Sequence, residues 1–242
     1  WMLFHLMYLL LAASVAGLWW LYPLPSLIFF LVISALHFGS SDIRHISPPS
    51  SKDAWVPLIA HGGLVTIAIP VLQSSSVEPL FAALVGTESS LWLVKQINQL
   101  RLPWAACLFA YVIYSVYQPR WRKSLLSLSV LIALAYLLPP LVSFALYFCL
   151  WHSRSHMQRI WRNIAQADRR RSANETLIYS LLAYAAAGVY FVLQTDTASA
   201  SVTAITPALL QLTFIGLAAL TVPHMVLVDF IHGQQQEDQQ HD

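Results

Sequence analysis

The stretch LPSLIFFLVISALHFGSSD, which runs from Leu24 to Asp42, decides the class of fold. It carries no charged residue before Asp42, and it is long enough to cross a bilayer, for which a helix needs about 20 mostly apolar residues. A helix on the surface of a soluble protein would instead carry a polar stripe along one face. The stretch therefore predicts a membrane-spanning helix whose last turns carry a histidine and an acid.

The composition of the whole chain agrees with this interpretation. Of its 242 residues, 57% are hydrophobic and 10% are charged, against about 45–50% and about 25% in soluble domains. The mean hydropathy is +0.61, and a formal net charge of +2 provides no basic field for a polyanion. These values exclude an ordinary cytosolic enzyme, a disordered chain and a nucleic-acid binder.

We therefore expect an all-α, polytopic membrane helical bundle with about eight transmembrane helices. The expected spans, separated by proline turns and polar loops, are 2–22, 24–42, 55–72, 102–117, 123–138, 140–160, 175–193 and 205–231. Residues 1–231 form a single transmembrane domain in this prediction, with an interfacial connector at about 73–101. Residues 232–242 form a polar cytoplasmic tail.

The basic residues predict the orientation of these spans. With eight crossings both chain ends lie on one side, and eleven of the 13 Lys and Arg residues fall on that side. Only Lys95 and Arg101 fall on the other. Because cytoplasmic loops carry the excess of Lys and Arg, we expect a multi-pass protein of the cell (inner) membrane with residue 1 and the C-terminus in the cytoplasm.

Five histidines fall inside the expected spans, namely His37, His61, His152, His156 and His224. At 1.5 Å per residue all five lie within about 6–12 Å of the cytoplasmic helix ends, so four helices place imidazoles in one layer. Histidines inside membranes usually face the bundle interior or a water-filled path, and imidazole suits Fe, Zn, Cu and Ni. The layer predicts a metal site, or the proton or metal relay of a transporter.

Two carboxylates follow histidines at the same spacing: Asp42 lies five residues after His37, and Asp229 lies five residues after His224. Metal-bound histidines usually donate their second N–H to a carboxylate or a carbonyl. An acid five residues away is poorly placed for its own histidine on a helix. We expect these acids to support a histidine on a neighbouring helix, to pair with Arg154, or to be interfacial charges.

Four segments in this order carry a resemblance to a known family. They are HFGSSD at 37–42, AHGG at 60–63, PPLVSFALYFCLWHSRSH at 139–156 and PHMVLVD at 223–229. Together they resemble the Brp/Blh-type β-carotene 15,15′-dioxygenases of bacteria and archaea, from about Tyr8 to Asp229.

This resemblance implies an integral membrane iron enzyme, a carotenoid-cleaving dioxygenase that splits β-carotene with O2 at its central double bond. The product is retinal, commonly made for a microbial rhodopsin. The resemblance implies Fe(II) as cofactor and His37, His152 and His156 as catalytic iron ligands. It leaves His61 and His224 as either ligands or supporting residues. The expected partners are β-carotene, O2 and membrane lipid, with no nucleic acid.

Aromatic residues near the expected site are candidates for contact with the polyene, namely Phe38, Tyr147, Phe148 and Trp151. The family pattern also includes an upstream helix that ends in a PHGxxD-like segment with a further ligand. Nothing before Trp1 supplies it, so we expect an N-terminally truncated chain that lacks this ligand helix. The alternatives are a histidine-lined metal or proton transporter and another membrane carotenoid or lipid oxidase.

Overall fold

A computed structural model describes residues 2–48, 51–154, 157–158, 161, 164–166, 168–194 and 202–238. Every regular element in these ranges is a helix, which confirms the all-α prediction. The elements are α1 (Met2–Leu21), α2 (Pro23–Ile43), α3 (Trp55–Gly63), η1 (Leu64–Ala68), α4 (Ile69–Leu72), α5 (Ser74–Val85), α6 (Thr87–Gln99), α7 (Arg101–Tyr117), η2 (Pro119–Trp121), α8 (Arg122–Leu137), α9 (Pro140–Ala145), η3 (Leu146–Ser153), α11 (Arg169–Gln194) and α12 (Val202–Asp238).

Within the described ranges, four helical segments are long and apolar enough to cross a membrane. They are Pro23–Ile43, Trp55–Leu72, Thr87–Tyr117 and Pro207–Val226. Three shorter apolar helices accompany them, namely His5–Leu21, Ser74–Val85 and Pro140–Ser153. The apolar helices agree with a membrane protein, while the expected number of about eight spans is not confirmed.

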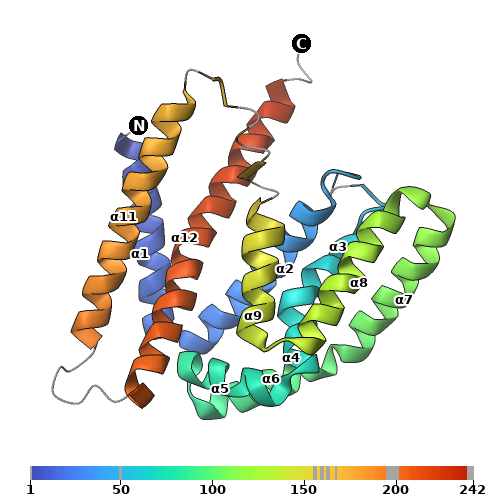
Figure 1. The fold of residues 1–242 in the computed structure, drawn as a ribbon, viewed down its shortest axis with the longest axis horizontal. Coiled ribbons are helices and arrows are strands. Elements are labelled where there is room, and N and C mark those ends of the chain that lie inside the picture. The colour runs from blue at the N-terminus through green and yellow to red at the C-terminus, as the bar shows by residue number, and fades with distance from the viewer. Residues whose placement is uncertain are drawn as a thin grey trace.

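The helices form two groups joined along α2 (Figure 1). In the first group α1 packs against α12, and α11 lies beside them. In the second group α2 packs most extensively against α3, which also contacts α7. The segment expected to be an interfacial connector forms α5 and α6 at the lower edge of Figure 1. Helix α12 continues to Asp238, beyond the expected start of a tail at residue 232.

Simple local rules explain several helix boundaries. Pro23 and Pro140 lie in the first turns of α2 and α9, where a missing N–H costs nothing. Gly86 separates α5 from α6 at φ +84°, a backbone conformation that glycine adopts readily because it lacks a Cβ. The turn between α5 and α6 therefore depends on this glycine.

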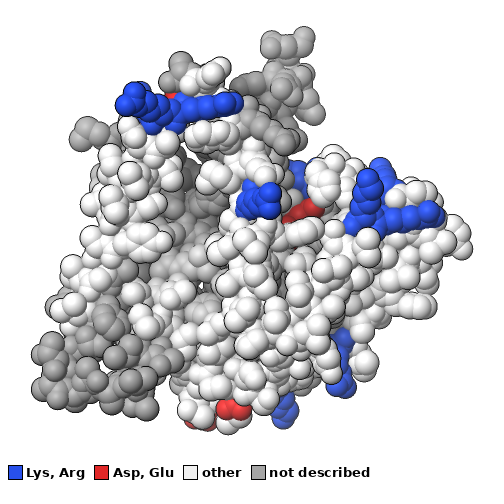
Figure 2. Space-filling model, in the orientation of Figure 1, with Lys and Arg blue, Asp and Glu red and all other residues white. Residues whose placement is uncertain are grey.

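Basic side chains gather along the upper rim in Figure 2, and fewer lie at the lower edge. At this rim Arg120 of η2 forms an ion pair with Asp53 in the loop before α3. Hydrogen bonds from Ser51 and Ser47, together with the Arg120 charge, hold the pKa of Asp53 below its usual value. These contacts tie the loop after α2 to the turn before α8.

Two π-helical segments interrupt the second group. Segment η1 continues directly from α3, and η3 continues from α9. Hydrogen bonds in a π-helix join residues five apart, and such segments are rare and often found at functional sites. Segment η1 follows the motif that contains His61, and η3 contains His152.

Candidate active site

The crossing of α2 and α3 brings two histidine motifs together. A Cβ on Gly39 would lie 3.1 Å from a backbone carbonyl carbon of α3, and one on Gly62 would lie 2.9 Å from a backbone carbonyl carbon of α2. Ordinary van der Waals contacts are about 3.5–4.0 Å. Because neither glycine has a Cβ, the two backbones approach closely, and Asp42 meets His61 across the crossing.

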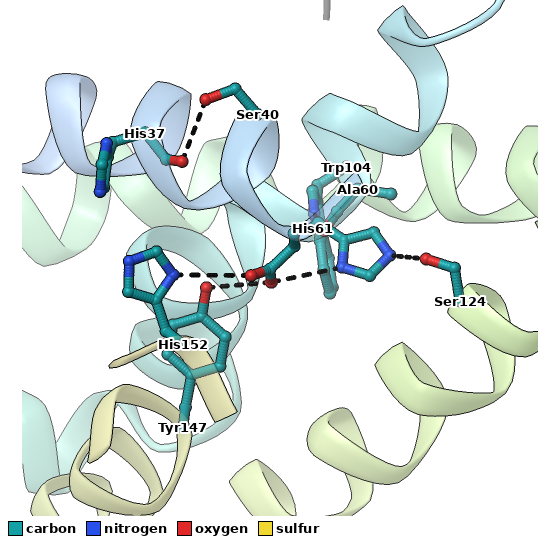
Figure 3. A network of polar contacts seen from close by, with 9 residues as sticks. His37, Ser40, Ala60, His61, Trp104, Ser124, Tyr147 and His152 are labelled. Carbon is teal, nitrogen blue, oxygen red and sulfur yellow. Dashed lines mark hydrogen bonds and ion pairs between the residues drawn. The ribbon is translucent and has the colours of Figure 1, made fainter. Parts of the chain in front are cut away.

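Asp42 is the centre of a buried polar network (Figure 3). Its side chain is 5% exposed, and its oxygens lie 3.5 Å from Nδ1 of His61 and 3.5 Å from Nδ1 of His152. The hydroxyl of Tyr147 donates a hydrogen bond of 3.0 Å to the same carboxylate. Both imidazole contacts are longer than a well-formed hydrogen bond. A buried carboxylate is costly unless it is paired, and these three side chains provide the pairing.

The π-helix η3 explains why Tyr147 and His152 reach the same carboxylate. Residues five apart on an α-helix lie about 140° apart around its axis. In a π-helix the hydrogen-bonded turn itself spans five residues, so Tyr147 and His152 share one face, with ring centroids 6.0 Å apart. Both side chains are buried.

His61 is held from both sides of its ring. Nε2 lies 2.9 Å from the hydroxyl of Ser124 on α8, and Nδ1 faces Asp42. The side chain is 2% exposed. The indole of Trp104 donates to the carbonyl of Ala60 at 3.3 Å and fixes the neighbouring turn of α3. Since both ring nitrogens face protein groups, this geometry favours a supporting role for His61.

His37 and His224 bring two more imidazoles close to His152. The rings of His37 and His152 have centroids 5.2 Å apart, and those of His37 and His224 have centroids 6.3 Å apart. Phe38 meets the His152 ring edge-on at 4.8 Å, and Phe148 stacks on it at 6.1 Å. Three distant helical segments therefore place their histidines together among aromatic side chains.

The spacing of these rings agrees with imidazoles that share a metal ion. A metal lies about 2.1 Å from its imidazole nitrogen and about 1 Å more from the ring centre, so ring centres around one ion are at most about 6.5 Å apart. The centroid distances of 5.2 and 6.3 Å fall within this limit. In the described ranges, no group of three or more His, Cys, Asp or Glu side chains is placed so that it could hold a metal ion. Imidazole is a donor type that suits iron, among other metals.

The remaining predicted residues have different outcomes. His156 lies outside the described residues, and Asp229 lies in α12 with its side chain outside them. Phe38 and Tyr147 are buried, whereas Trp151 is 39% exposed. Tyr147 is hydrogen-bonded to Asp42, so it also belongs to the polar network.

Several residues of the site did not emerge from the sequence. Ser124 is a single serine on a helix expected only to span the membrane, and no local pattern marks it. Gly39 and Gly62 fall inside the quoted motifs, and their proximity to histidines was the available signal. The contacts of Asp42 agree with one alternative from the sequence, a carboxylate that supports histidines on neighbouring helices.

The structure thus gathers histidine side chains from four helical segments beside a buried carboxylate and among aromatic side chains, in a bundle of apolar helices. Residues 1–232 match the family model described as "Beta-carotene 15,15'-dioxygenase". The chain belongs to this family and is a carotenoid-cleaving dioxygenase.

Two relatives support this membership. A β-carotene 15,15′-dioxygenase of uncultured marine bacterium 66A03 is 38% identical over 229 residues, which cover 93% of this chain and 79% of that protein. The probable β-carotene 15,15′-dioxygenase Blh of Halobacterium salinarum is 27% identical over 175 residues, which cover 63% of this chain and 49% of that protein. No solved structure matches the chain.

Proposed function

We propose that this chain cleaves the central 15,15′ double bond of β-carotene with O2 at the histidine cluster. In this reaction the central C=C bond and the O–O bond break and two C=O bonds form. One β-carotene and one O2 thus become two molecules of retinal. The observation that carries the proposal is the convergence of His37, His152 and His224 in a protein whose relatives bear the name of this activity.

We infer that the cluster binds Fe(II). His37 and His152 are the proposed ligands, together with His156, and His224 lies near enough to His37 to contribute. Ferrous iron held in this way supplies the binding and activation of O2, since imidazole ligands suit iron. His61 is assigned to the support of Asp42 because its two nitrogens already face Ser124 and Asp42.

Asp42 and the aromatic side chains prepare the site for this chemistry. A carboxylate beside Nδ1 of His152 holds a proton on that nitrogen and keeps the Nε2 lone pair available, as supporting carboxylates do for metal-bound histidines. The hydroxyl of Tyr147 donates a hydrogen bond to the same carboxylate and fixes its position. Phe38 and Phe148 cover the His152 ring and exclude water from the reacting centre.

We further propose that the protein lies in the cell membrane, surrounded by lipid, with its Lys- and Arg-rich rim in the cytoplasm. The apolar substrate then reaches the site from the bilayer without crossing water. Retinal released there can serve a microbial rhodopsin in the same membrane.

The direct test uses bacteria that accumulate β-carotene and express the complete gene. We expect loss of β-carotene and a gain of two molecules of retinal for each β-carotene lost, measured by chromatography of cell extracts. His37→Ala and His152→Ala should abolish retinal formation and lower the iron content of the purified protein. His45→Ala is the matched control, because His45 is an exposed histidine in the turn after α2.

Retinal formation that survives both cluster substitutions would refute the assigned site. A well-expressed, iron-loaded protein that leaves β-carotene intact would refute the assigned reaction.

A further inference from the structure

An apolar cavity lies beside the histidine cluster. Its walls come from α2, the η1 and α4 segments, α5, α9 and α12. Apart from the hydroxyls of Ser34 and Thr66, the lining side chains are hydrocarbon. The lining suits a hydrocarbon ligand.

The cavity follows α2, whose Leu27, Phe30, Ser34 and Phe38 all line it. The eleven steps from Leu27 to Phe38 correspond to about 16 Å along a helix. This distance is close to half the length of an extended carotenoid, from one ring to the central double bond.

The two ends of the cavity differ in character. At one end Phe38 contacts the ring of His152. At the other end Leu27 packs in one buried cluster with Val77 and Phe81 of α5, and α5 lies across the lower end of α2 in Figure 1. The cavity therefore begins at the histidine cluster and stops against α5.

Ser34 gives an independent sign that the cavity accepts a ligand. Its side chain is 3% exposed, and its hydroxyl has no hydrogen-bond partner among the described residues. The other lining hydroxyl, that of Thr66, donates to the carbonyl of Gly62. Buried hydroxyls are normally paired. Ser34 precedes His37 by about one helical turn, so a new aldehyde oxygen at the cluster end would provide an acceptor.

We propose that this cavity is a ruler that selects the bond to be cut. One half of the carotenoid fills it, with the ring stopped by α5, and the stiff polyene then places its central double bond at the histidine cluster. The inference rests on the proposed function and adds what fixes the position of the cut. The position is set by the depth of the cavity, because the hydrocarbon lining offers the polyene no polar anchor along its length.

The test changes the depth of the cavity and identifies the products. Val77→Phe places a ring at the α5 end, so the polyene enters less deeply and the cut moves to a neighbouring double bond. The expected products are two aldehydes of unequal length in place of retinal alone. Val85→Phe is the matched control: Val85 is also buried on α5 but does not line the cavity. It should yield retinal only.

The reverse change should also move the cut. Phe81→Leu deepens the cavity, so we again expect an unequal pair of aldehydes, and its products decide the matter if Val77→Phe yields no aldehyde. Retinal as the sole product of the active cavity variants, at whatever rate, would overturn the ruler while leaving the proposed function intact. An unaltered protein that forms no aldehyde would refute the proposed function, and the ruler with it.

Discussion

The close crossing of α2 and α3 predicts that a single methyl group at Gly62 disturbs the whole site. In Gly62→Ala the new Cβ would lie 2.9 Å from a backbone carbonyl carbon of α2. The carbonyl oxygen of Ala35 would lie closer still, and ordinary contact begins at about 3.5 Å, so the helices must separate. Asp42 and His61 are already 3.5 Å apart, and further separation breaks their contact.

The free energy follows from two opposing effects. Overpacking typically costs about 1–3 kcal/mol, whereas replacing glycine by alanine within a helix gains about 1 kcal/mol. Gly216→Ala on α12 is the matched control, because nothing lies within 4 Å of its added Cβ. The control gains the helix preference without the overlap.

The assay is thermal unfolding of both purified variants in detergent, alongside retinal formation. A difference of about 1–3 kcal/mol corresponds to a midpoint roughly 2–12 °C lower for Gly62→Ala than for Gly216→Ala, at about 2–4 °C per kcal/mol for a chain of this size. We expect retinal formation to fall only in Gly62→Ala. Equal midpoints and equal activities in the two variants would refute the role assigned to the crossing.

Three further predictions concern the polar network and the metal. Asp42→Asn keeps the shape of the side chain but removes the charge that orients two histidines, so iron affinity should fall about 10–100-fold; an iron titration with Asp53→Asn as control measures this, and equal affinities would contradict it. Ser124→Ala leaves Nε2 of His61 buried without its partner, so the free energy of unfolding should fall by about 1–3 kcal/mol. Chemical unfolding measures this loss. Ser129→Ala is the control and should show no comparable loss, because Ser129 is exposed on the same helix. Removal of metal with a chelator should abolish retinal formation, and Fe(II) but not Zn(II) should restore it; restoration by Zn(II) would exclude the assigned cofactor.

The sequence predicted the position of the site along the helices better than its internal arrangement. Depth along the expected spans placed His37, His152 and His224 in one layer, and their rings lie together in the structure. This succeeded because the rise per residue of a helix is nearly constant. Depth carries no information about which side of a ring faces which neighbour, so the Ser124 contact of His61 was not predictable.

The π-helix η3 shows a second limit of sequence patterns. In an α-helix residues five apart lie on different faces, whereas η3 aligns Tyr147 with His152. A π-helical segment depends on the packing of its neighbours as well as on its own residues. Helix α5 belongs to the segment expected to be an interfacial connector, and its Val77 and Phe81 are buried in one cluster with Leu27 of α2. The apolar stretch of α5 is too short to span a membrane, and in the structure it closes one end of the cavity.

X-ray absorption at the iron edge tests the central claim most directly, when recorded on anaerobically purified protein expressed from the complete gene. We expect one iron per chain with light-atom ligands at about 2.1 Å and the outer-shell scattering of imidazole. This imidazole scattering should weaken in His152→Ala and stay unchanged in His45→Ala. Protein without iron, or an imidazole signal that is identical in His152→Ala, would contradict the account.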